Sequence, residues 1–347
     1  MYERIAEIAR DIATFEQEKK CLAEELRKKD DGVFHDALER NLVRKVKTKG
    51  VNATVGAVDG GLLAQEFHGI DLVLARAVAV LFEYKDSKLV SHRYHPGPIV
   101  SPDVDALSYL ETHEFMWYKS LFRLKKELDI ATEAIEKFKP EYMFLDGSIV
   151  PQISDKPSED SEIRGLYDDI IKRYKELYKC ADISGCCLVG IIKDSRGKRF
   201  IEILRKHLEE GQLGRTHDTG FLNFLLRSGE RTFTFRYSSS VKEHQVLKDL
   251  NDWSSRVDAF YLKAIEGDRP LRVEFIEGEK SFDEIASIVF DLSRISKNYA
   301  YPAVLIEADM RAALDRGELD RVYGELVAKT GLRSSTMKLR RDSRPFR

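Results

Sequence analysis

Short apolar runs and longer amphipathic stretches follow one another along this chain. From Tyr2 to about Lys29 apolar residues recur near helical spacing, which predicts a long amphipathic helix with charged outer faces. We also predict helices from Phe34 to Val46 and from about Asp103 to Lys137. The runs VGAVDGG and YMFLDGS are typical of buried strands, and they bring Asp59 and Asp146 to glycine turns.

The order of the elements after Val51 indicates a fold class. The strand ending at Asp59 comes first, and LVLARAVAVLFEY and KLVSHRYHP follow it on either side of a turn at residues 85–87. A helix, the strand ending at Asp146, another helix and the apolar run CCLVGIIKD come next. This is the order of the ribonuclease H-like fold, in which carboxylates on neighbouring strands converge at one edge of a mixed sheet. We therefore predict an α/β protein with a ribonuclease H-like mixed sheet flanked by helices.

Further elements extend this core at both ends. GERTFTFRYSSS and RPLRVEFIEGE predict two more strands, and helices are predicted from Phe282 and from about Val304 to Lys329. We expect an N-terminal helical extension over residues 1–50, one ribonuclease H-like domain over 51–330 and a basic tail over 331–347. Six Arg and Lys residues stand against one acid in this tail, which could contact a DNA backbone.

The composition narrows the class of protein. The 347 residues are 43% hydrophobic and 33% charged, which is enough apolar material for a large core. A net charge of -2 argues against a uniformly basic nucleic-acid coat. No apolar stretch approaches the roughly 20 residues of a membrane span, and the N-terminus does not resemble a signal peptide. The four cysteines form no CxxC pair. We expect a cytoplasmic protein without a membrane partner.

Carboxylates supply the candidate chemistry. If the strands that carry Asp59 and Asp146 are neighbours, the two side chains would make a metal site. Hydrolysis of a phosphodiester needs charge neutralisation, an activated water and a stabilised leaving oxygen, which divalent cations provide. Mg²⁺ and Mn²⁺ prefer oxygen ligands. A third ligand could come from Glu111 or Glu114, which share a helical face, and a fourth from Asp309.

Each candidate has a plainer interpretation. An aspartate before glycine often only caps a turn, and most acids on a charged helix are solvated. Lys193 closes the run CCLVGIIKD before SRGKR. It could hold a phosphate, or it could lie in a solvated loop that ends the strand.

The motifs in their order resemble the NurA family, nucleases of archaea and some bacteria that work with the hexameric translocase HerA in processing DNA ends. The resemblance spans about Val51 to Leu314. It rests on VDGG, the acidic helix after the hairpin, LDGS, KDSR, DTGFLNFLLRSGERT and YAYPAVLIEADMRAAL.

The resemblance implies a metal-dependent DNA nuclease. The core over residues 51–330 would be a NurA-type nuclease domain that uses Mn²⁺, with Mg²⁺ also possible. The implied activities are 5′–3′ exonuclease and single-strand endonuclease, acting on single strands and duplex ends during resection of double-strand breaks. The implied assembly is a homodimer docked on the HerA ATPase.

The resemblance also carries roles onto single residues. Lys193 matches the basic position after the fourth strand, where it would hold the substrate phosphate, and Tyr301 matches a tyrosine of the active-site region. Glu111 fits the helical position nearly as well as Glu114. The implied metal ligands are Asp59, Glu114, Asp146 and Asp309.

Some positions leave the family pattern or lack a role. Many members have histidine where this chain has Asp309, which still suits a metal but cannot shuttle a proton near pH 7 as an imidazole can. Asp218 and Arg231 match recurring positions, for which we expect structural roles.

Two other functions stay open from the sequence. The chain could be a non-catalytic DNA-binding or adaptor subunit of the same complex. It could also be an actin-like or sugar-kinase-like ATPase, with residues 59–61 and 146–148 as phosphate loops. The second alternative needs two duplicated halves, and no second three-strand start follows Ile149.

Overall fold

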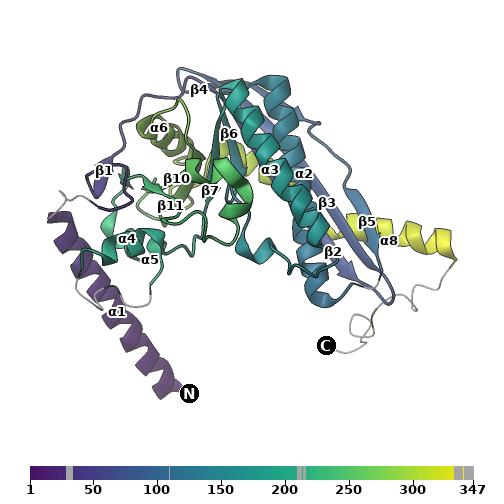
Figure 1. Cartoon of the computed structure of the whole chain (residues 1–347), viewed down its shortest axis with the longest axis horizontal. Helices are drawn as coiled ribbons and strands as arrows, with labels where there is room; N and C mark the ends of the chain where they lie inside the picture. Colours follow the sequence, from purple (N-terminus) through teal and green to yellow (C-terminus); the bar gives the residue numbers. More distant parts are fainter. Residues whose placement is uncertain (29–33, 109, 209–212, 214–215, 332–338, 340–347) are drawn as a thin grey trace.

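A computed structural model gives the fold and describes residues 1–28, 34–108, 110–208, 213, 216–331 and 339. An eleven-stranded mixed sheet forms the centre of the molecule (Figure 1). Most of the basic tail, predicted over 331–347, lies outside the described residues. None of the described helices is long and apolar enough to cross a membrane.

Five strands form the predicted core. β2 (Thr54–Glu66), β3 (Asp71–Lys85) and β4 (Lys88–His95) are antiparallel neighbours. β6 (Tyr142–Asp146) pairs parallel with β2, and β7 (Cys187–Ile192) pairs parallel with β6. This arrangement confirms the ribonuclease H-like strand order predicted from the sequence.

Shorter strands widen the sheet beyond β7. The order continues through antiparallel pairs from β7 to β11, β10, β8 and β1, while β9 pairs with β10 and β5 with β3. Their bounds are Leu271–Ile276 for β11, Val257–Lys263 for β10, Glu230–Thr232 for β8, Val43–Lys45 for β1, Phe235–Arg236 for β9 and Asp103–Leu107 for β5.

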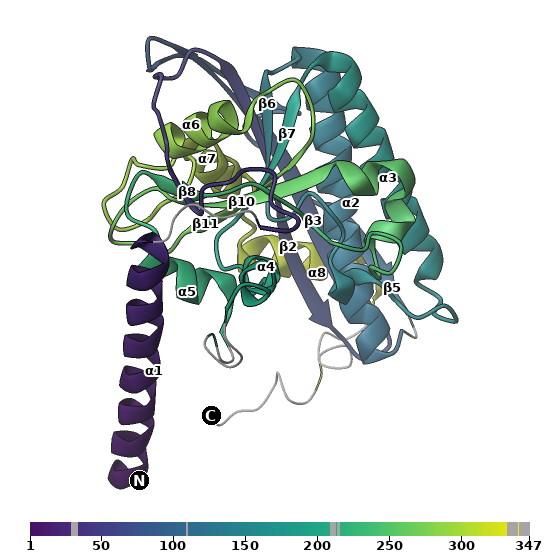
Figure 2. The same cartoon turned by 60° about the vertical axis from the view of Figure 1, so that its left-hand side comes forward.

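Helices cover both faces of the sheet. The α-helices are α1 (Tyr2–Lys28), α2 (Thr112–Phe138), α3 (Arg164–Ser184), α4 (Arg199–Arg205), α5 (Asp218–Leu225), α6 (Phe282–Leu292), α7 (Ala303–Ala312) and α8 (Arg316–Thr330). Short 3₁₀ segments, η1 (Ile153–Asp155) and η2 (Leu247–Arg256), lie between them. α2 and α3 run side by side along one face (Figure 1). α1 projects away from the sheet (Figure 2).

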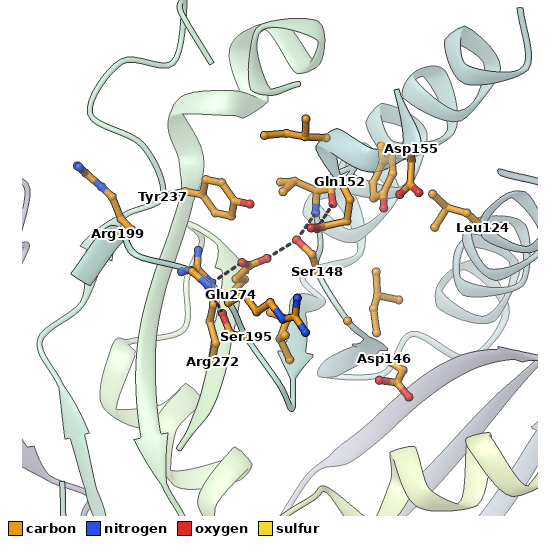
Figure 3. Close-up of a pocket in the computed structure, with 18 of the residues that line it drawn as sticks. Leu124, Asp146, Ser148, Gln152, Asp155, Ser195, Arg199, Tyr237, Arg272 and Glu274 are labelled. Atoms are coloured by element: carbon orange, nitrogen blue, oxygen red, sulfur yellow. Dashed lines mark hydrogen bonds and ion pairs between the residues drawn. The ribbon is translucent and has the colours of Figure 1, made fainter. Parts of the chain in front are cut away.

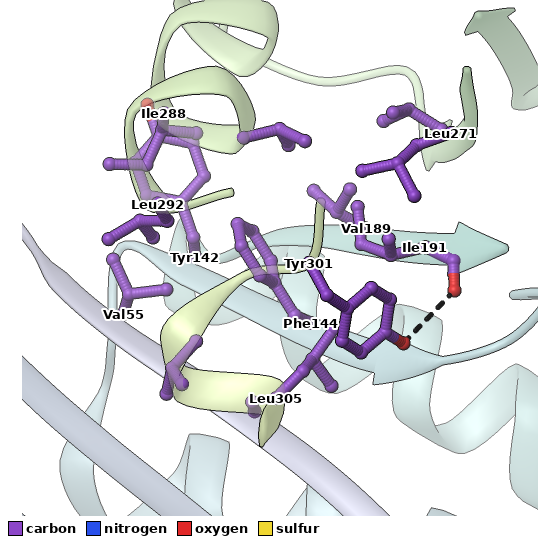
Figure 4. Close-up of a cluster of buried hydrophobic side chains, with 14 of the residues drawn as sticks. Val55, Tyr142, Phe144, Val189, Ile191, Leu271, Ile288, Leu292, Tyr301 and Leu305 are labelled. Carbon is purple, nitrogen blue, oxygen red and sulfur yellow. Dashed lines mark hydrogen bonds between the residues drawn. The ribbon is translucent and has the colours of Figure 1, made fainter. Parts of the chain in front are cut away.

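The alternation of side chains along the strands divides the core into two layers. Ala57 of β2 packs in a cluster with α6 and α7, whereas its neighbour Val58 packs in the cluster under α2 and α3. Figure 4 shows Tyr301 in the first cluster, close to Phe144 and beside the β7 residue Ile191. The two layers fix the positions of α2 and α7 on opposite faces of β2 and β3.

Three helix predictions were wrong in whole or in part. Residues 34–46 form turns and the edge strand β1, because Glu39 binds the β8 segment and Val43 to Lys45 pair with it. Residues 103–107 form β5, since the long β3 extends far enough to need a further partner strand. The last predicted helix is divided into α7 and α8, and Asp315 caps the second one in a capping box.

Arg231, whose role was open in the sequence, ties three parts of the fold together. Its side chain is fully buried and donates to both carboxylate oxygens of Glu39, at 2.6 and 2.8 Å. It also donates to Asp283 of α6 at 2.6 Å. One buried guanidinium thus joins β8, the chain before β1 and α6.

We expect Arg231→Ala to lower the free energy of unfolding by about 3–5 kcal/mol, because two carboxylates lose their buried partner. Urea denaturation of the purified protein measures this change. Arg4→Ala, which removes an exposed pair with Glu7 on α1, should leave the urea midpoint unchanged. Equal midpoints for all three proteins would contradict this role of Arg231.

Candidate active site

The two aspartates indicated by the sequence lie on neighbouring strands. Val58 of β2 is in register with Leu145 of β6, so Asp59 and Asp146 follow side by side. Asp146 ends its strand as predicted, and Gly147 takes the turn with a φ of +111°. Asp59 does not end its strand, because β2 continues to Glu66 alongside β3.

The glycines after Asp59 therefore serve close packing rather than a turn. A Cβ on Gly60 would overlap the carboxylate of Glu127, which belongs to α2. A Cβ on Gly61 would overlap the carbonyl of Ala312 at the end of α7. Since successive side chains point to opposite faces, this bare stretch of β2 lets α2 and α7 approach it from both sides.

Asp146 accepts hydrogen bonds from Tyr301 and Lys193, the two further residues that the sequence assigned to the site. The Tyr301 hydroxyl donates to its Oδ1 at 2.6 Å, and the Lys193 Nζ donates to its Oδ2 at 3.1 Å. The Lys193 ammonium also lies 4.0 Å from the centre of the Tyr301 ring. The Tyr301 hydroxyl is 3.4 Å from the carbonyl of Ile191 (Figure 4). The predicted grouping of Asp146, Lys193 and Tyr301 is thus present.

Asp309 reaches Asp59 from α7. Burial raises the pKa of Asp59 to about 7, and the negative charge of Asp146 and a hydrogen bond with Asp309 add to the rise. A hydrogen bond between two carboxyl groups needs a proton on one of them. Asp59 is buried, Asp146 half-buried and Asp309 exposed, so the group opens toward solvent at Asp309.

The fourth carboxylate is Glu127, which the sequence pattern did not single out. Burial raises its pKa to about 8; the charge of Arg123 opposes the rise, and the charges of Asp59 and Asp146 reinforce it. Arg123, one turn earlier on α2, donates to the Glu127 carboxylate. The available signal was an acid next to the apolar stripe of this helix, beside Leu128.

Glu114 and Glu111 lie elsewhere. Glu114 accepts hydrogen bonds from the Ser161 hydroxyl at 2.9 Å and from the backbone N–H of Glu162 at 3.2 Å. Glu127 stands thirteen positions further along α2, which is roughly 20 Å along a helix. Glu111 is the exposed residue just before α2. The structure brings neither glutamate to the aspartates.

The donor set suits a hard divalent cation. Within the described residues no three Asp, Glu, His or Cys side chains already stand as a metal-holding group. The Lys193 ammonium pairs with Asp146, while burial and the neighbouring acids raise the pKa of Asp59. Oxygen donors of this kind are the ligands that Mn²⁺ and Mg²⁺ prefer. The residues present therefore fit such a metal.

A cavity of about 840 Å³ opens beside Asp146 and Glu127. Figure 3 shows Ser148, Glu274 and Arg272 of its lining joined in a row by hydrogen bonds and an ion pair. The Ser148 hydroxyl donates to Glu274 at 2.6 Å, and the Arg272 Nε donates to the same carboxylate at 2.7 Å. The site is thus a cluster of carboxylates beside a polar cavity.

Comparison with known proteins agrees with this geometry. A family model described as "NurA domain" matches residues 53–314. The NurA nuclease from Sulfolobus solfataricus has a similar structure, with a TM-score of 0.62, 18% identity, and 95% of this chain and 97% of that one covered. No curated protein sequence matches the chain.

Two further similar structures carry ligands. A NurA with manganese has a TM-score of 0.54, 11% identity, and 97% of this chain and 99% of that one covered. A NurA bound to dAMP and manganese has a TM-score of 0.52, 10% identity, and 96% and 97% covered. These likenesses confirm the predicted fold.

We expect Gly61→Ala to lower the free energy of unfolding by about 1–3 kcal/mol, because its methyl group would push against the backbone of Ala312. Thermal or urea unfolding measures the change. Gly324→Ala in α8 adds the same methyl group where it meets nothing within 4 Å. That control should be neutral or slightly stabilising, by up to about 1 kcal/mol. Equal effects of the two substitutions would contradict the close approach of α7 to β2.

Proposed function

Because this chain belongs to the NurA family, we propose that it is a divalent-metal-dependent nuclease that hydrolyses DNA phosphodiester bonds. The observation that carries the proposal is the convergence of carboxylates around buried Asp59, whose pKa responds to both Asp146 and Asp309. The proposed metal ligands are Asp59, Glu127, Asp146 and Asp309.

A divalent cation bound here would supply charge neutralisation for the phosphate, a more acidic water and stabilisation of the leaving oxygen. Tyr301 and Lys193 would position Asp146 and the substrate. Tyr301 stays a hydrogen-bond donor, since burial raises the pKa of its hydroxyl far above its usual value, and it orients Asp146. Lys193 donates to the same carboxylate, which places its ammonium where it could bind a phosphate oxygen beside Asp146.

We propose Mn²⁺ as the cofactor, with Mg²⁺ as an alternative. All four side chains offer oxygen donors, which both ions accept. Two of the similar NurA structures hold manganese, and one also holds dAMP. Asp309 adds a carboxylate where many family members have histidine, which keeps the donor set purely oxygen.

Membership of the family supports further proposals on activity, compartment and partners. We propose 5′–3′ exonuclease and single-strand endonuclease activity in double-strand-break end resection, in the cytoplasm, by a homodimer that works with a HerA-type hexameric ATPase. The exposed residues Ile5, Ile8 and Ile12 of α1 would support docking to a second copy or to that ATPase.

The adaptor alternative has less support. A binding module gains nothing from gathering acids where DNA phosphates would lie. The ATPase alternative would need a duplicated core and an adenosine pocket, and the described sheet has one set of three antiparallel starting strands.

Cleavage of end-labelled single- and double-stranded DNA by the purified protein, with Mn²⁺, Mg²⁺ or EDTA, tests the proposal. We expect cutting with Mn²⁺, none with EDTA, and loss of at least about a hundredfold in Asp59→Asn. Full activity in Asp59→Asn or in EDTA would overturn the proposal. Metal-independent DNA binding without cutting, also after addition of the ATPase, would favour the adaptor.

Glu127→Gln and Glu114→Gln form a matched pair on one helix. We expect Glu127→Gln to lower the cleavage rate by at least about a hundredfold, because it removes a charge from the proposed metal site. Glu114→Gln should stay within a few-fold of wild type, since its carboxylate only binds the chain near Ser161. Single-turnover cleavage with saturating Mn²⁺ measures both. The reverse order of effects would mean that the glutamate was wrongly chosen.

A further inference from the structure

Two exposed cations of the cavity lining have no ion-pair partner among the described residues. Arg196 and Lys198 are exposed, line the cavity and lie on the segment between β7 and α4. In the described part of the chain, neither forms a salt bridge. The other Arg side chains that line the cavity have acidic partners: Arg199 binds Asp36 at 2.7 Å, Arg272 binds Glu274, and Arg123 binds Glu127.

Buried hydrogen bonds hold this segment in place. The hydroxyl of Thr219 donates to the carbonyl of Ser195 at 2.9 Å, and the N–H of Gly197 donates to the Ser195 hydroxyl at 3.1 Å. The N–H of Asp218 donates to the carbonyl of Gly197 at 2.9 Å. The backbone next to Arg196 is therefore fixed on both sides.

Asp218 also connects this segment to polar residues that line the cavity. The buried carboxylate of Asp218 accepts the N–H groups of Phe200 and Ile201, each at 3.0 Å, and the hydroxyl of Tyr261 at 2.9 Å. Arg272 donates to that hydroxyl at 3.2 Å and begins the row to Glu274 and Ser148. This gives Asp218 the structural role expected from the sequence.

Among the described residues, no acid that lines the cavity forms an ion pair with Arg196 or Lys198. Glu127 is bound by Arg123, and Glu274 by Arg272 and Ser148. Four more acids line the cavity and have partners of their own. Asp146 binds Lys193 at 3.1 Å and Asp155 accepts from Ser120, while Asp194 lies 4.0 Å from Arg269 and Glu202 lies 3.9 Å from Arg199. Arg196 and Lys198 are thus two cations of the cavity lining that form no ion pair within the described residues.

We propose that Arg196 and Lys198 bind the phosphates of a single DNA strand that runs through the cavity to Asp146. This rests on the nuclease function proposed above. A volume of about 840 Å³ is that of a pocket for a drug-sized molecule, and a duplex, whose major groove alone is about 12 Å wide, does not enter it. The rings of Tyr237 and His244, 5.8 Å apart, line the same cavity and give bases a surface for stacking.

Fluorescence anisotropy of a short labelled single-stranded oligonucleotide in EDTA tests this site without any cleavage. We expect the double variant Arg196→Ala/Lys198→Ala to bind roughly tenfold more weakly than wild type. The slope of log K against log salt should fall by about 1.4, since each lost phosphate contact on a single strand removes about 0.7. In Mn²⁺, the variant's KM for single strands should rise while kcat stays near wild type.

Lys88→Ala/Lys179→Ala is the matched control. Both lysines are exposed and have no ion pair within the described residues, and they lie away from the cavity, after the turn following β3 and on α3. This variant changes the net charge equally and should bind single strands as wild type does. Equal weakening by the two double variants would overturn the site in favour of a general charge effect.

The two proposals fail in different ways. If the variant of Arg196 and Lys198 binds single strands with wild-type affinity and salt slope while the protein still cuts DNA, the strand site is wrong and the nuclease stands. If wild type binds through these residues but never cuts with any metal, the nuclease is wrong and the site stands. An equal loss of blunt-duplex binding would overturn the assignment to a single strand.

Discussion

The repulsion between carboxylates gathered around β2 is the constraint on which the candidate site depends. Asp59 and Glu127 are buried, and burial together with neighbouring negative charge raises the pKa of both. A fold gains no stability from such a group. The fold therefore has to hold these carboxylates together. Parallel pairing of β2 with β6 and the packing of α2 and α7 on opposite faces of β2 do so.

Small residues and polar partners make this packing feasible. Gly60 and Gly61 remove the side chains that would keep Glu127 and the end of α7 away from β2. Lys193 and Tyr301 then fix Asp146, the carboxylate that borders the cavity. Tyr301 links the hydrophobic core to the site, since its ring is buried in the core (Figure 4) while its hydroxyl donates to Asp146.

The sequence predicted the structural features that depend on residues close together along the chain. Apolar runs ending in Asp-Gly located β6, and the parallel pairing of its neighbour brought Asp59 and Asp146 together as predicted. The sequence did not indicate Glu127, because its role depends on which face of α2 meets the glycines of β2. Residues 34–46 were mistaken for a helix, since their partner strand lies almost two hundred residues later.

Calorimetric titration of the DNA-free protein with Mn²⁺ tests the central claim most directly. Wild type should show saturable binding, and Asp146→Asn should bind at least about tenfold more weakly, because one of the four proposed ligands loses its charge. Unfolding measurements on both proteins establish that the variant is folded. Equal Mn²⁺ affinity of the two folded proteins would contradict the assignment of these carboxylates as the metal site.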